Sequence, residues 1–378
     1  MTDITISSAV RSNLNALQST SKMMSEVQEK LSTGKKVNSA LDNPNSFFTA
    51  KGLENRANDL SSLLDDMGQS VQTLKAADTG IGAISDLVDA AKAKANQASQ
   101  TSSQSERAQY SKEYNELLTQ IEDIAKDSGY KGKNLLGGTG NDLSVTFNED
   151  GSSSLSISSV DFTDSASTTG LSLSDLAEGS ESSSTIDLGT AANTSVTLDS
   201  ATQFATGDVI SITDVNGTEL GSLEVTDTTT VADLEAVYDG IDGVSAAFTT
   251  DTLTVTSDFE ITTKSTGSTP ADTTSSGGTN SGFAKDSDID AALSKLKGAQ
   301  DTLRSQASTF GTNLSIVESR QDFTNKLINT LEEGAGKLTL ADTNEEGANL
   351  LALQTQQSLA STSLSLASQA DQNVLRLF

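Results

Sequence analysis

The C-terminal stretch, residues 350–378, carries the pattern that most constrains how this chain can fold. Mostly apolar side chains recur there in alternating steps of three and four residues. This spacing is typical of the buried seam of a helix that lies along another helix. The seam comprises Leu350, Leu353, Gln357, Ala360, Leu364, Ala367, Asp371, Val374 and Phe378.

A second row of side chains runs beside this seam. A helix that covers one small core needs only one apolar stripe. Two adjacent stripes that continue to the last residue indicate a helix end buried among several neighbours. The second row comprises Leu359, Thr362, Leu366, Ala370, Asn373 and Leu377.

The N-terminus shows the same rhythm, at Val10, Leu14, Leu17, Ser21, Met24, Gln28 and Leu31. One interpretation is an intramolecular hairpin, in which the first and last helices pair with each other. The other interpretation, which we favour, is that both ends also join a helical assembly of several chains.

The composition excludes several classes of enzyme. Hydrophobic residues make up 34% of the chain and aromatic residues 4%, which is thin for one compact enzyme core. The chain has no Cys and no His, so thiol chemistry, disulfides, His-based acid–base catalysis and the usual zinc sites are excluded. We therefore expect a protein that is not an enzyme, with no cofactor and no catalytic residues.

No stretch approaches the roughly 20 apolar residues that a membrane-spanning helix needs. The N-terminus, MTDITISSAV, lacks the basic and apolar regions of a secretory signal. We therefore expect no membrane partner and no cleavable signal peptide. A role outside the cell would require a different export route.

The net charge of −28 is concentrated in the middle of the chain. Residues 142–282 contain 23 acidic residues and one basic residue, Lys264. Such a surface repels nucleic acid and keeps an exposed module soluble. We expect no nucleic-acid partner.

Helical patterns occupy both flanks of this acidic segment. The first helix is predicted at about 5–33, with Gly34 ending it, and a second long helix begins at Asn43-Pro44. A turn at 100–106 separates that helix from a shorter one that ends at Gly129. Helical pattern returns near 286 and runs to 331, where 332–338 is predicted to interrupt it before the final helix.

Residues 142–282 have short β-patterned runs, namely LSVTF, SLSIS, SVTL, DVISITDV, GSLEVT, DTLTVTS and FEITT. Asn216-Gly217 predicts a hairpin, and residues 230–241 give the one clear helical pattern of this segment. The Ser/Thr/Gly-rich segment 265–282 is predicted to be a linker. The predicted fold is mainly α with a β-rich insert, and the long stripe of 286–331 is expected to pack antiparallel on that of 60–98.

Asp286, Asp288 and Asp290 form a D-x-D-x-D run that superficially resembles a calcium loop. Such a loop needs Gly at the sixth place and an acidic residue at the twelfth, where this chain has Ala291 and Lys297. Acidic residues favoured by a helix N-terminus explain the run better. No metal site is expected.

Both ends of the chain resemble bacterial flagellins. SSAVRSNLNALQSTSKMMSEVQEKLSTGKKVNSALDNP (7–44) is similar to the start that the family shares, and LASQADQNVLRLF (366–378) is similar to its end. The resemblance covers about 1–140 and 285–378. It implies a structural subunit that polymerises into the flagellar filament used for swimming.

The resemblance also implies that the parts of the chain form successive layers of the filament. Residues 1–42 and 338–378 would form an inner helical tube, 43–141 and 283–337 an outer helical tube, and 142–282 a variable, surface-exposed insert. The self-assembly contacts would involve Val10, Leu14, Leu17, Met24, Leu31, Leu350, Leu353, Leu364, Val374 and Phe378.

The partners implied are further copies of the chain, in a helical homopolymer, together with a flagellar export chaperone and the hook-associated and cap proteins. Type III export to the extracellular filament would fit the missing signal sequence. Two alternatives remain: a hook–filament junction protein of the same axial family, and a secreted module whose insert binds a ligand.

Overall fold

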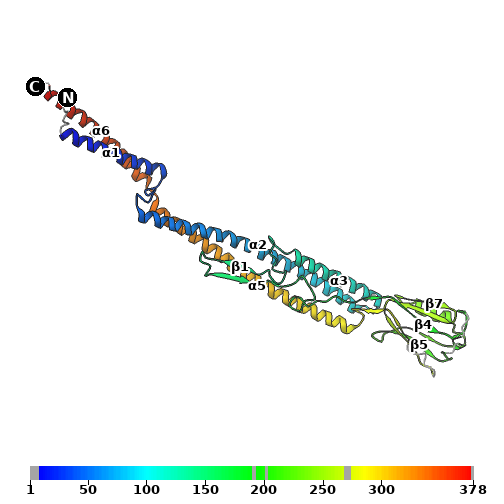
Figure 1. Ribbon diagram of the computed structural model, residues 1–378. Helices are drawn as coiled ribbons and strands as arrows, with labels where there is room; N and C mark the ends of the chain where they lie inside the picture. Colours follow the sequence, from blue (N-terminus) through cyan, green and yellow to red (C-terminus); the bar gives the residue numbers. More distant parts are fainter. Residues whose placement is uncertain (1–7, 190–192, 201–202, 268–273, 376–378) are drawn as a thin grey trace. The chain divides into compact units, whose positions relative to one another are not determined.

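A computed structural model describes residues 8–189, 193–200, 203–267 and 274–375 (Figure 1). Its described residues fall into two compact units. The first unit lies within Met1–Gly68, Thr146–Ser154 and Ser319–Phe378, and the second within Gln69–Val145 and Leu155–Glu318.

Six α-helices account for most of the described chain. Asn43 begins α2 as predicted, because its Oδ1 accepts a hydrogen bond from the Ser46 amide at 3.1 Å. The helices are α1 (Ser8–Thr33), α2 (Pro44–Gln100), α3 (Gln104–Asp127), α4 (Val231–Asp239), α5 (Asp286–Thr339) and α6 (Thr343–Leu375).

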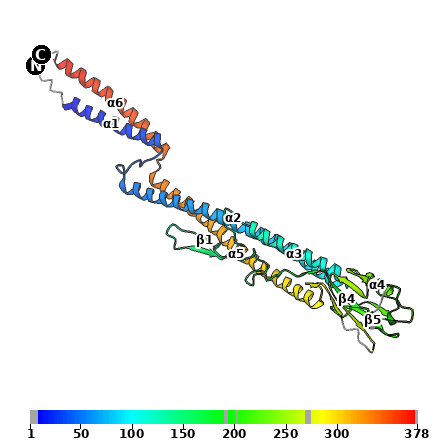
Figure 2. The same ribbon diagram turned by 45° about the vertical axis from the view of Figure 1, so that its right-hand side comes forward.

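In the first unit, α1 and α6 lie side by side in both views (Figures 1 and 2). The segments that follow α1 and α5 pair through a bridge between Lys35 and Leu340. The Lys36 amide donates to the Thr339 carbonyl at 2.7 Å, and the Ala341 amide donates to the Gly34 carbonyl at 3.0 Å. This backbone pairing sets where α1 and α6 begin to run together.

In the second unit, α2 and α5 run antiparallel, which confirms the predicted pairing of the two long stripes. Lys75 Nζ lies 3.4 Å from Glu318 Oε1, and Lys92 Nζ donates to Gln300 Oε1 at 3.2 Å. The shorter helix α3 packs beside them, and Tyr114 on α3 meets Phe283 edge to face at 5.5 Å between ring centroids.

Most of the β-rich insert also belongs to the second unit, while Thr146–Ser154 falls in the first. Its larger sheets have the strand orders β10-β9-β5-β6 and β4-β8-β7, and the strand pairs within them are antiparallel. Helix α4 contributes Leu234 and Tyr238 to a core that both sheets share. The strands are β3 (Glu178–Ser180), β4 (Ser182–Asp187), β5 (Val209–Asp214), β6 (Glu219–Glu224), β7 (Val244–Thr249), β8 (Thr252–Ser257), β9 (Glu260–Ser265), β10 (Thr274–Gly277) and β11 (Thr279–Ser281).

A separate two-stranded sheet pairs β1 (Leu143–Thr146) with β2 (Ser154–Ile157). Two predicted features of the insert are confirmed. Asn216-Gly217 joins β5 to β6, with Gly217 at φ +80°, and α4 falls within the predicted 230–241.

Three local predictions are wrong. Helix α5 continues through 332–338, because Leu331 and Ala335 are buried on the same face and Gly334 lies against Leu53. The run SVTL leads into a 3₁₀ turn, Leu198–Ser200, rather than a strand. In the predicted linker 265–282, residues 274–277 and 279–281 form β10 and β11, whose Ser and Thr residues pair through the backbone, while 268–273 lie outside the described residues.

Candidate functional site

The paired helices α1 and α6 hold the predicted assembly residues. On α6 the first predicted stripe is half-buried in the described chain, and we call it the covered row. It comprises Leu350, Leu353, Gln357, Ala360, Leu364 and Ala367. The 3–4 spacing therefore identified the face that α6 turns toward α1.

On α1 the observed seam differs from the predicted one at every second position. Val10, Leu17, Met24 and Leu31 are at least half-buried, as the pattern predicts. Between them the buried or half-buried side chains are Asn13, Thr20 and Val27, whereas Leu14, Ser21 and Gln28 are exposed.

Helix geometry permits this shift by one residue, and side-chain chemistry explains it at Val27 and Thr20. The side chains three and four residues along a helix flank the same seam, so either can turn inward. Val27 is apolar and Gln28 is not. Thr20 donates its hydroxyl to the Ala16 carbonyl at 2.9 Å, so burying its side chain leaves no unpaired hydroxyl.

Two polar contacts fix the register of the helix pair. Lys30 Nζ lies 3.4 Å from Glu346 Oε1, and the Glu346 side chain is only 13% exposed. Asn13 Nδ2 donates to Ser363 Oγ at 3.3 Å. The contacts lie far apart along both helices, so together they hold α1 and α6 antiparallel in one alignment.

As far as its side chains are described, the second predicted stripe of α6 is uncovered; Leu377 lies outside the described residues. Leu359 is 67% exposed and Leu366 63% exposed, and Thr362 and Ala370 beside them are also exposed. Leu351 is 66% exposed one residue after the start of the covered row. We call Leu351, Leu359, Thr362, Leu366 and Ala370 the exposed row.

Two predicted assembly residues, Val374 and Phe378, come at the end of the sequence. Val374 falls within α6, and Phe378 lies outside the described residues. Sequence reasoning also missed exposed apolar side chains elsewhere in the first unit, at Leu41, Phe48, Phe323 and Leu340. Each is an isolated large side chain outside a regular apolar stripe, so periodicity gave no signal for it.

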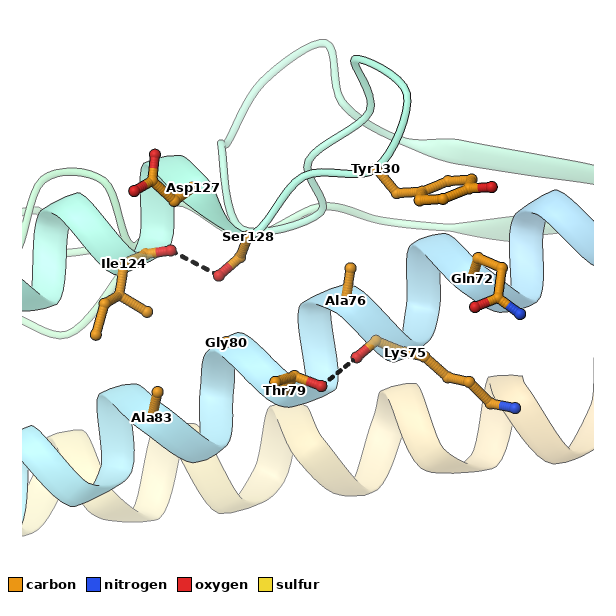
Figure 3. Close-up of a pocket in the computed structure, with 10 residues that line it drawn as sticks. All are labelled: Gln72, Lys75, Ala76, Thr79, Gly80, Ala83, Ile124, Asp127, Ser128 and Tyr130. Atoms are coloured by element: carbon orange, nitrogen blue, oxygen red, sulfur yellow. Dashed lines mark hydrogen bonds between the residues drawn. The ribbon is translucent and has the colours of Figure 1, made fainter.

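A groove of about 510 Å³ lies between α2 and the end of α3 in the second unit (Figure 3). Small residues on α2, including Ala76, Gly80 and Ala83, leave space beside Ile124. The hydroxyl of Ser128 donates to the Ile124 carbonyl at 2.6 Å, so it is engaged within its own helix end. The groove lining therefore offers no nucleophile paired with a base.

The acidic run at the start of α5 takes the structural role expected of it. Asp286 and Asp288 lie in the first turn, and Asp286 Oδ1 pairs with Arg107 Nη2 at 2.7 Å. No group of three or more His, Cys, Asp or Glu side chains gathers as a metal site among the residues with described positions.

The perturbed titratable groups are explained by structural contacts. A hydrogen bond from Lys94 holds the pKa of Glu113 below its usual value, and burial raises the pKa of Tyr114 to about 12. Within the described parts of the chain, no helix has the length and apolar character needed to cross a bilayer.

Comparison with known proteins identifies the two flanks. Residues 4–141 match the bacterial flagellin N-terminal helical region, and residues 293–378 match the bacterial flagellin C-terminal helical region. Among solved structures, the flagellar junction protein FlgL from Legionella pneumophila is 14% identical, with 75% of this chain and 99% of that chain covered. Its TM-score is 0.24, which is too low for this likeness to support a conclusion about fold or function.

Curated relatives agree with the family models along the whole chain. Flagellin A of Rhizobium meliloti is 28% identical over 407 aligned positions that cover all of both chains. Flagellin FljO of Caulobacter vibrioides is 32% identical over 53% of this chain and 69% of its own length. The chain belongs to the bacterial flagellin family, whose members are the structural subunits of the flagellar filament.

Proposed function

We propose that this chain polymerises into the filament through its paired terminal helices, with the exposed row of α6 packing against a neighbouring copy. The observation that carries this proposal is the division of α6 into two apolar rows. α1 covers one row, while the other leaves Leu351, Leu359 and Leu366 more than 60% exposed. A contiguous apolar row on a helix surface favours a further helix as its partner.

Burial of the exposed row contributes to the driving force. Fully burying one Leu side chain contributes about 1.5–3 kcal/mol, and each copy brings three such side chains. Repeated heterologous contacts between identical chains generate an open helical polymer, because each copy presents one surface and receives another. A row that one copy leaves exposed would then be buried along the length of the filament.

The remaining parts of the chain take the layers that the flagellin resemblance implies. Residues 1–42 and 338–378 form the innermost layer in this proposal, and residues 43–141 and 283–337 form the next one. The acidic insert, 142–282, faces solvent. Its single basic residue against 23 acidic residues suits a surface that stays hydrated and does not stick to neighbouring filaments.

The accessory partners follow from the same family. We propose export through the flagellar type III apparatus with a chaperone, capping at the filament tip, and attachment through hook-associated proteins, at an extracellular location. A non-enzymatic role fits a chain with neither His nor Cys.

Point substitutions on α6 test the polymer contact. In the double variant Leu359→Asp with Leu366→Asp, two charges enter the exposed row. The matched double variant Ser361→Asp with Ser368→Asp adds the same charges at exposed positions with the same spacing on another face of α6. We expect seeded solutions of the leucine variant to yield no filaments by negative-stain electron microscopy, whereas the serine variant polymerises.

Removal of residues 351–378 provides a second arm of this test. We expect the truncated chain to form no filaments, while circular dichroism still detects the helices and sheets of the second unit. Filaments of normal length from the leucine variant would contradict the role of the exposed row. Filaments from the truncated chain would contradict the role of α6 as a whole.

A further inference from the structure

The carbonyl oxygen of Ala284, just before α5, is the meeting point of three side-chain donors in the second unit. Gln104 Nε2 donates to it at 3.2 Å and Arg107 Nη1 at 2.9 Å, both from the first turn of α3. Asn216 Nδ2 donates at 2.8 Å from the turn between β5 and β6. One backbone atom thus joins the helices to the distal part of the insert.

Further hydrogen bonds surround this point. Gln104 Nε2 also donates to Asp214 Oδ2 at 2.8 Å, and Asn216 Oδ1 accepts from the Asp286 amide at 3.4 Å. Arg107 extends the network to Asp286 through the ion pair described above. We call the contacts of Gln104, Arg107 and Asn216 with Ala284 the junction lock.

The helix side of the junction lock and Asp214 are buried, whereas Asn216 is exposed. Gln104, Arg107, Asp214 and Ala284 are each no more than 5% exposed. Hydrogen bonds in such surroundings are stronger than in water, and an unpaired partner left there is costly. Displacing the insert would separate the buried Asp214 carboxylate from Gln104 and the Asn216 amide from the Ala284 carbonyl. Arg107 would keep its acceptors on the helix side. The lock therefore favours one orientation.

The covalent connection alone would not impose that orientation. The chain enters the distal part of the insert through β3 and leaves it through β11, which pair at Thr279–Ser180 and Ser281–Glu178. A two-stranded ribbon of this length is only marginally stable by itself. The turn that carries Asn216 provides a second attachment, separate from this stem.

We infer that the insert is held in a single orientation on the helices by the junction lock, with Asn216 as its positioning residue. This goes beyond polymerisation, since the lock lies in the second unit and contains none of the proposed assembly residues. Every copy in a filament would then present its acidic insert in the same direction. The filament surface would be an ordered array rather than a layer of freely swinging modules.

Spin-label distances in the full-length monomer test this inference. The chain has no Cys, so Ala93→Cys on α2 and Ala247→Cys on β7 supply the only two thiols, both at exposed positions. We expect a narrow distance distribution between labels at these sites. Asn216→Asp removes the donor to Ala284 while conserving side-chain shape, and we expect it to broaden the distribution at least twofold.

The matched control is Asn193→Asp, which adds the same charge in an exposed turn where Asn193 Oδ1 accepts from the Ser195 amide. It should leave the distribution narrow. Gln104→Met weakens the lock from the helix side without altering the insert sequence, and it should broaden the distribution as Asn216→Asp does. Hydrogen exchange in β5, β8 and β9 should stay slow in all variants, as expected of a folded insert.

A broad distribution in the background chain would overturn the inference. So would a narrow distribution in both Asn216→Asp and Gln104→Met. If Asn216→Asp unfolds the insert, so that hydrogen exchange in β5 becomes fast, the result for Gln104→Met decides alone. Filament formation is not the readout, so this test can fail while the polymerisation proposal stands.

Discussion

At the scale of single residues, a buried tyrosine shows how one polar group makes the stability of this chain depend on pH. Tyr238 on α4 is fully buried, and its hydroxyl lies 2.7 Å from Thr263 Oγ1 on β9. Burial raises the pKa of Tyr238 to about 12, against an ordinary value of 10.0. The neutral Tyr238 side chain contributes to the stability of the folded state. This contribution is fully present below pH 10 and is lost as the pH rises through 12.

We therefore predict opposite effects of Tyr238→Phe at neutral and alkaline pH. At pH 7 the variant should be less stable by about 1 kcal/mol, because Thr263 loses its buried partner. Above pH 10 the free energy of unfolding of the wild-type chain should fall by up to about 1.4 kcal/mol per pH unit from this group alone. The variant lacks the hydroxyl and should not show this loss. Denaturant titrations at pH 7 and pH 11 check this; a stability gap of equal size at both would refute it.

Gly80 and Gly82 on α2 offer a second residue-scale prediction. A Cβ at position 80 would overlap Ser128 in the groove of Figure 3, whereas a Cβ at position 82 would meet no atom within 4 Å. Gly82→Ala should stabilise the second unit by about 0.5–1 kcal/mol through reduced backbone entropy.

Gly80→Ala should instead destabilise it, because α3 must move away from α2 to make room. Thermal unfolding followed by circular dichroism compares the two substitutions directly. Equal shifts in the same direction would show that the close approach of Ser128 to Gly80 is not a constraint.

At the scale of elements, local signals were predictable from the sequence. The capping box at the start of α4 is an example, since Thr230 and Asp233 bond each other's backbone amides within a single turn. The helix start at Asn43-Pro44 and the hairpin at Asn216-Gly217 were predictable for the same reason. Each of these features depends on contacts between neighbouring residues alone, so the local sequence is enough to predict it.

Elements that depend on distant partners were not predictable. β4, SSSTID, has only one buried side chain, Ile186, and it is a strand because its backbone pairs with β8. The glycines at 334 and 336 indicated a break in α5, yet packing around Leu331 and Ala335 keeps the helix continuous. Tertiary contacts overrode local propensity in both places.

In the candidate site, too, the locally determined part was predictable and the part that depends on distant contacts was not. The covered row of α6 followed from its spacing, because an apolar seam with a period of about 3.5 residues has one face to bury. The choice between Leu14 and Asn13, or between Gln28 and Val27, depended on how α1 is rotated against α6. That rotation is set by contacts between distant parts of the sequence, such as Lys30 with Glu346, which are 316 residues apart.

At the scale of the whole molecule, the insert differs from the helical flanks in its net charge. The segment 142–282 holds 23 of the 52 acidic residues and only one of the 24 basic residues. Copies repeated along a polymer would make its surface strongly anionic, so filaments should repel one another at low salt. Screening shortens the range of this repulsion to about 10 Å at 0.1 M ionic strength.

We accordingly predict that raising ionic strength or adding divalent cations makes filaments associate side by side. Light scattering of preformed filaments should rise with NaCl and, at far lower concentrations, with MgCl₂. Filaments from a chain in which Asp and Glu of the insert are replaced by Asn and Gln provide the control and should scatter independently of salt. Scattering of the native filaments that does not change with salt would contradict the proposed role of the insert's charge.

The most direct test of the polymerisation proposal is a helical reconstruction of the filament by cryo-electron microscopy. We predict that Leu351, Leu359 and Leu366 are buried against a neighbouring copy in the innermost layer and that the acidic insert lies outermost. A filament in which these leucines face an open, water-filled space, while other surfaces join the copies, would contradict the proposal.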